Sequence, residues 1–206
     1  QLCAWSNDPL AETPHEHFAL QDLRSGEVWN LAPGPGAAAV DYRIEHSPQC
    51  SRISHRRGDL VIELSWQVDA LHAARHVQVC LTNGGGHGRR LRLLGAIEWL
   101  LGAVLVDRQS VRTSHTRLTP DGSATLDVLL ATQLSQHDGA AGQTAFWALQ
   151  PLDADGRDAI TPDWTCDRRE LLDARGRLVW PDGFGHLAGH GGDPCAALGL
   201  ALRLDA

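Results

Sequence analysis

The chain has 206 residues, of which 43% are hydrophobic, and it carries a formal net charge of −7. That length suits one large all-β domain with a sizeable core, and the negative charge argues against a nucleic-acid groove, which needs a basic stripe. The most apolar run, residues 93–106, contains Glu98 and is too short and too polar to span a bilayer.

The first 37 residues are expected to be extended or rich in turns, because the Pro- and Gly-rich run at 32–36 suits neither a helix nor a central strand. His15 and His17 flank Glu16 in this segment. On a strand the two imidazoles would share a face and could ligate a metal, but no motif supplies a third ligand. A solvated N-terminal segment is therefore the favoured interpretation.

Alternating apolar and polar residues predict strands at 40–46, 59–69 and 76–81. In the second of these, Glu63 lies on the polar face, opposite the face that carries the leucines. Residues 91–105 differ, because their apolar positions recur every three or four residues. This spacing predicts an amphipathic helix of about three turns, which runs into a strand at 104–108.

The remaining chain predicts a hairpin formed by 111–117 and 124–134, a short apolar segment at 145–150, an acidic stretch at 151–182 and a terminal strand at 196–204. Antiparallel strands with short turns favour a sandwich over a barrel. The predicted fold is therefore an all-β, two-sheet β-sandwich, mostly antiparallel, with long connecting loops and one short helix. It forms a single domain over residues 1–206.

The five cysteines are widely spaced and form no C-x-x-C pair, which argues against a zinc ribbon or a redox motif. The chain begins at Gln1 rather than Met, as a secreted chain would after loss of its signal peptide. Wide spacing in a secreted chain favours disulfides that close long loops. The candidates, of which an odd one must stay unpaired within the chain, are Cys3, Cys50, Cys80, Cys166 and Cys195.

No catalytic frame is recognisable, so the sequence predicts neither an enzyme nor a cofactor. The carboxylates form no recognisable pair, and the serines lack a nucleophile elbow. The glycine-rich run 84–90 lacks the signature of a phosphate-binding loop and is expected to be a flexible connector. Tryptophans interspersed with carboxylates suit either a binding surface for an arginine- or lysine-rich protein or a core with ordinary solvated charges.

Four stretches, taken in order, resemble the secreted immune-evasion proteins of poxviruses, of the viral CC-chemokine inhibitor type. They are residues 12–17, 42–54, 98–107 and 178–184. The chain has no lysine, and this coding bias resembles the parapoxvirus branch, which points to a chemokine-binding protein.

The resemblance implies a secreted decoy, monomeric or homodimeric, that binds host chemokines on a sheet face and blocks their receptors. By family position Trp180, Asp127 and Val128 belong to the binding face, and Glu63 and Asp182 are added on charge alone. One alternative is a binder of granulocyte-macrophage colony-stimulating factor, interleukin-2 or other cytokines on the same fold. A second alternative is a secreted metal-binding protein or enzyme centred on His15 and His17. Neither a membrane nor a nucleic acid is expected as a partner.

Overall fold

The computed structural model describes residues 1–4, 15–34, 40–119, 125–135, 141–150 and 161–206. Over these residues the chain is built from strands and 3-10 turns, with no α-helix. None of the described helices is long and apolar enough to cross a membrane. The 3-10 helices are η1 (Leu105–Ser110) and η3 (Arg168–Glu170). The strands are β1 (Glu16–Asp22), β2 (Val28–Asn30), β3 (Arg43–His46), β4 (Cys50–Arg57), β5 (Leu60–Val68), β6 (Arg75–Asn83), β7 (Arg89–Glu98), β8 (Val111–Leu118), β9 (Leu126–Gln133), β10 (Thr144–Ala148), β11 (Asp163–Asp167) and β12 (Pro194–Leu204).

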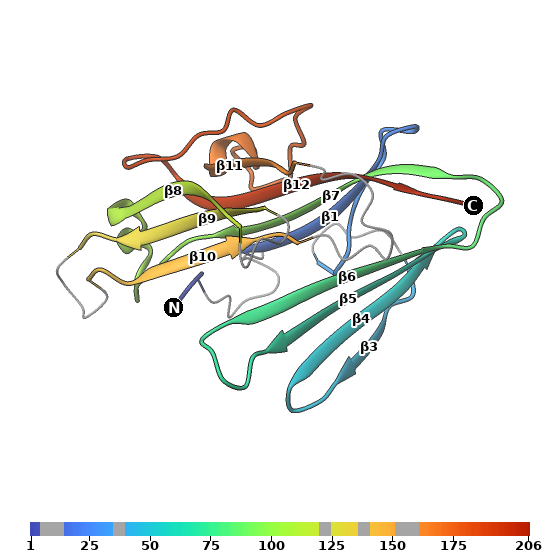
Figure 1. The fold of residues 1–206 in the computed structure, drawn as a ribbon, viewed down its shortest axis with the longest axis horizontal. Coiled ribbons are helices and arrows are strands. Elements are labelled where there is room, and N and C mark those ends of the chain that lie inside the picture. The colour runs from blue at the N-terminus through green and yellow to red at the C-terminus, as the bar shows by residue number, and fades with distance from the viewer. Residues whose placement is uncertain (5–14, 35–39, 120–124, 136–140, 151–160) are drawn as a thin grey trace. The chain divides into compact units, whose positions relative to one another are not determined.

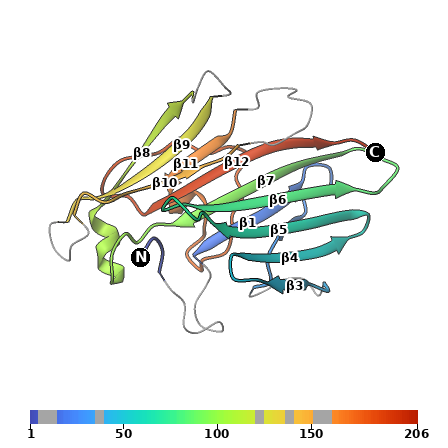
Figure 2. The same cartoon turned by 60° about the horizontal axis from the view of Figure 1, so that its bottom comes forward.

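The strands form three sheets with the orders β11-β12-β7-β1-β2, β10-β9-β8 and β3-β4-β5-β6 (Figures 1 and 2). Neighbouring strands in the second and third sheets are antiparallel throughout. Gly58, at a φ of 60°, lies in the tight connection between β4 and β5 and supplies the left-handed conformation that such a turn requires. The predicted all-β, mostly antiparallel sandwich is confirmed.

The chain divides into two compact units. Unit 1 comprises residues 1–17 and 94–200, and unit 2 comprises residues 18–93 and 201–206. The chain crosses between them within strands β1, β7 and β12, so these strands belong partly to each unit.

Unit 1 has a core between two sheets. Ile97 of β7 and Leu198 of β12 pack with Val111 of β8 and Leu129 of β9. Ala96 and Ala197, which directly precede Ile97 and Leu198, point to the opposite face of the sheet. They belong to a second cluster with Leu171, Leu172 and Phe184. Within unit 1, β7 and β12 are therefore covered on both faces.

This double burial explains why the predicted helix at 91–105 is wrong. A strand buried on both faces is apolar at successive positions rather than at alternate ones, and periodicity alone does not separate such a run from a buried helix. The structure places residues 89–98 in β7. The predicted strand at 104–108 is also wrong, because those residues lie at or just before η1.

Unit 2 contains the four-stranded sheet. Leu60, Ile62 and Leu64 of β5 are fully buried, whereas the intervening residues, including Glu63, are half-buried. Phe18 packs edge-on against Trp66, with 5.9 Å between ring centroids. The predicted alternation of β5 is thus confirmed.

All five cysteines are free thiols in the structure, so the predicted disulfides are not formed. For one pair the sheet register explains the absence. Cys50 lies opposite Gln67 on β5, Cys80 lies opposite Glu63, and β5 separates the two cysteines. Strands lie about 4.8 Å apart, so the two Cα atoms exceed the roughly 7 Å limit for a disulfide.

Candidate functional site: a pocket and a buried carboxylate in unit 1

A pocket of about 270 Å³ lies in unit 1. Three segments line it: the start of β8, the end of β11 with the residues that follow, and the loop that leads into β12. Its polar lining includes Thr113, Asp167, Arg169 and His190, and its apolar lining includes Val111, Leu187 and Pro194.

The loop at 184–192 is anchored to the unit at several points. Asp163 accepts the backbone N–H of Phe184 and contacts Nε2 of His186 at 2.9 Å. The Thr113 hydroxyl accepts the backbone N–H of Gly189 at 3.1 Å. His186 has a φ of 54°, which is unusual for a residue with a side chain. These contacts hold the loop in one conformation against the cost of that backbone geometry.

Asp167 and Arg169 form a charge pair at the pocket wall. Asp167 is buried and accepts hydrogen bonds from the backbone N–H of Arg169 at 3.0 Å and from its Nε at 2.9 Å. These bonds from Arg169 lower the pKa of Asp167 although burial opposes them, and the carboxylate in turn raises the pKa of Arg169. The pair stays ionised and adds no net charge to the pocket.

An aromatic stack lies on β8, β11 and the loop. Trp164 stacks with both His115 and His186, at distances of 4.3 Å and 5.1 Å between ring centroids and with planes inclined by 19° and 12°. Asp127 of β9 contacts Nε2 of His115 at 2.7 Å and accepts from Nε of Arg117 at 3.0 Å. The Trp164 ring is therefore engaged by two stacked imidazoles.

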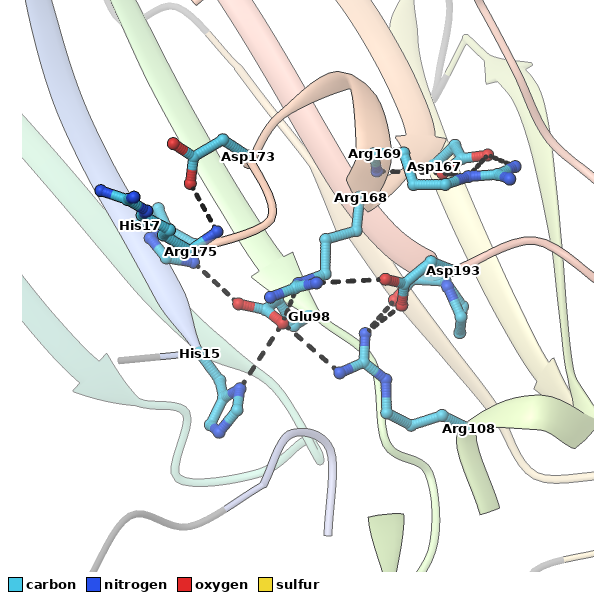
Figure 3. Close-up of polar contacts among 11 residues, drawn as sticks. His15, His17, Glu98, Arg108, Asp167, Arg168, Arg169, Asp173, Arg175 and Asp193 are labelled. Atoms are coloured by element: carbon cyan, nitrogen blue, oxygen red, sulfur yellow. Dashed lines mark hydrogen bonds and ion pairs between the residues drawn. The ribbon is translucent and has the colours of Figure 1, made fainter. Parts of the chain in front are cut away.

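Glu98, at the end of β7, is 2% exposed and is surrounded by cationic or protonatable groups (Figure 3). Its Oε1 lies 3.0 Å from Nε2 of His17, and its Oε2 lies 2.6 Å from Nε of Arg168 and 3.4 Å from Nη1 of Arg108. Asp193 bridges the same two arginines at 2.6 and 3.2 Å. The network joins β1, β7, η1, η3 and the start of β12.

The Glu98 carboxylate is held ionised. Burial raises its pKa, but the contacts with His15 and His17 and the charge of Arg168 outweigh burial, so the pKa lies well below its usual range. Such a group cannot serve as a general acid near neutral pH. Its role is to hold the segments that meet around it.

His15 and His17 share a face, as a strand requires, and both approach Glu98. The described residues contain no cluster of three side chains that could hold a metal ion, so the structure adds no third ligand to His15 and His17. Two guanidinium groups contact the same carboxylate, and their positive charge opposes a divalent cation at this position.

The residues predicted to form one binding face belong to two different units of the chain. Asp127 and Val128 are buried on β9 in unit 1, whereas Glu63 is half-buried on β5 in unit 2. Trp180 packs against the Leu94, Ala96 and Phe184 cluster, and Asp182 is exposed nearby in the chain. The first ten residues of the predicted acidic stretch, 151–160, lie outside the described residues.

Sequence reasoning missed Glu98, Asp167 and Arg169 as site residues. For Glu98 a signal existed, since a carboxylate inside an apolar run must be paired if the run is buried. For Asp167 and Arg169 the sequence offered no comparable signal.

The described part of the chain thus defines a β-sandwich domain with a small pocket of mixed polar and apolar lining. The whole chain, residues 1–206, matches the glycosyl hydrolase 94 supersandwich domain, and it belongs to this family. It is 29% identical over 216 residues to the cyclic beta-(1,2)-glucan synthase NdvB of Rhizobium meliloti (strain 1021). That match covers 100% of the chain but 7% of the relative.

This family membership overturns the viral interpretation. The resemblance to poxvirus immune-evasion proteins is wrong, and with it the decoy function, the host chemokines as partners and the cytokine-binding alternative. The resemblance depended on four short stretches of sequence, whereas the family match extends over the full chain. Secretion remains a prediction.

Proposed function

We propose that this chain is a non-catalytic sandwich domain of a carbohydrate-processing protein that acts on a β-glucan. Its family consists of glycosyl hydrolase 94 supersandwich domains, and its similarity to a cyclic beta-(1,2)-glucan synthase supports a β-(1,2)-linked substrate for the longer protein. In this proposal the chain supports that protein's action, and the bond chemistry occurs elsewhere.

The ionised state of the buried carboxylates is the main support for the proposal that this domain is non-catalytic. Glycoside hydrolysis needs one carboxylic acid with a raised pKa to protonate the leaving oxygen. Glu98, Asp127 and Asp167 are each engaged by arginine or histidine, and each has a lowered pKa. Held ionised by these partners, none of the three can supply that proton near neutral pH.

The test is an assay of the purified 206-residue chain with β-(1,2)-glucan, in which release of reducing ends is measured. We expect no turnover above that of a heat-denatured sample. Turnover that disappears on Glu98→Gln, Asp127→Asn or Asp167→Asn, in a variant that remains folded by circular dichroism, would show that the chain is itself catalytic.

A further inference from the structure

We propose that the pocket at the 184–192 loop of unit 1 binds one ring of an uncharged saccharide. The inference rests on the proposed function, which it deepens by naming the ligand and the residues that take it. Three properties of the pocket support it: its charge balance, its size and lining, and the anchoring of its loop.

The charge balance favours a neutral ligand. Asp167 already neutralises the charge of Arg169. An anion that approached the guanidinium would be repelled by the neighbouring carboxylate, and a cation that approached the carboxylate would be repelled by the guanidinium. A sugar has hydroxyl groups that both donate and accept. Neighbouring hydroxyls can therefore donate to the carboxylate and accept from the guanidinium without disturbing the pair.

The size and lining favour a single ring. The volume of about 270 Å³ is just below the roughly 300 Å³ at which small-molecule sites begin. Val111, Leu187 and Pro194 supply apolar surface for the C–H groups of a ring, and Thr113 and His190 add polar groups. A few polar groups on a partly apolar wall are the usual composition of such a site.

The anchored loop lowers the cost of binding. Gly189 and Gly191 have φ values of 145° and 82°, and Gly189 is hydrogen-bonded to Thr113 of β8. A ligand then needs to order little of the pocket when it enters.

The experiment is a titration of the ¹⁵N-labelled chain with sophorose, the β-(1,2)-linked disaccharide of glucose, followed by amide chemical shifts. We expect saturable shifts at Gly189, Gly191 and Gly192. Arg169→Gln should weaken binding by about tenfold or more, the effect of losing a charged hydrogen bond. His190→Ala is a second variant, which leaves the Asp167–Arg169 pair intact and should also weaken binding.

Arg177→Gln is the matched control. Arg177 pairs with Asp173 through Nε at 2.8 Å and is 71% exposed, as Arg169 is 72% exposed beside Asp167, but it does not line the pocket. Its loss should leave the affinity unchanged.

The pocket proposal is overturned if sophorose causes no saturable shift at millimolar concentration, if the shifts lie outside the loop, or if Arg169→Gln and His190→Ala both bind as wild type. A preference for inorganic phosphate over sophorose at the same amides would also overturn it. None of these results changes the reducing-end assay, so the proposed function stands or falls separately.

Discussion

Glu98 shows how a single charge is accommodated inside an apolar segment. Removing a carboxylate from water costs several kcal/mol unless its partners compensate for the loss. Here Arg108, Arg168 and His17 surround the two oxygens, and Asp193 balances the second positive charge. The network depends on all members being present, because each removal leaves a poorly solvated charge behind.

Glu98→Gln should therefore destabilise unit 1 strongly. The amide keeps the shape of the side chain but leaves Arg108 and Arg168 with Asp193 as their shared carboxylate. Breaking a buried ion pair in this way costs about 3 kcal/mol or more, measured as a fall in the free energy of unfolding in urea.

The control for this variant is Glu45→Gln, which breaks the exposed ion pair of Glu45 with Arg43. Exposed pairs contribute little, so its effect should stay within about 0.5 kcal/mol. Equal effects of the two substitutions would show that the Glu98 network does not stabilise the fold.

Strand β7 shows what sequence patterns can and cannot reveal about an element. The half-buried strand β5 has a clear alternation and was predicted within one residue at each end. In contrast, β7 is apolar on both faces within unit 1, and its spacing imitates that of a helix. Deciding between the two needs the other strands and the 171–184 segment, which cover β7 from positions far along the chain.

Ile97 tests the core that β7 forms with the strands of the neighbouring sheet. In β7 its side chain is 1% exposed and belongs to the core between the two sheets. Ile97→Ala should reduce the free energy of unfolding by about 2–5 kcal/mol through lost burial and a residual cavity. The matched change Ile44→Ala removes a side chain that is 47% exposed on β3 and should cost much less. A small loss at Ile97 would contradict the described core.

For the whole molecule, the fold class was predictable and the function was not. Strand alternation and turns are local properties, so they indicated an all-β sandwich. The pocket combines Thr113, Asp167 and His190 from three separate segments, and no short motif links them. The viral resemblance was wrong because it also depended on short stretches of sequence, and short stretches do not identify a family of sandwich proteins.

Carboxylates with a lowered pKa determine how the stability of the whole chain responds to acid. Backbone N–H groups of Leu71 and His72 lower the pKa of Asp69 to about 2, and the pKa values of Glu98, Asp127, Asp167 and Asp173 are also lowered. A carboxyl whose pKa is lower folded than unfolded stabilises the fold fully above its unfolded pKa, near 4. That stabilisation is lost as the pH falls through the folded value.

Burial lowers the pKa of His55, so we expect the urea midpoint to fall slightly between pH 7 and about pH 5 as unfolding allows this imidazole to take up a proton. It should then fall steadily towards pH 2 as the carboxylates titrate. Glu98→Gln should flatten this fall, because its own titration is removed, whereas Glu45→Gln should leave it unchanged. Salt should weaken the contribution of the half-buried Asp69 more than that of the buried Glu98, since screening acts mainly on solvated charges. A midpoint that rises on acidification, or an acid response identical in wild type and Glu98→Gln, would contradict the assignment of Glu98 as the dominant buried anion.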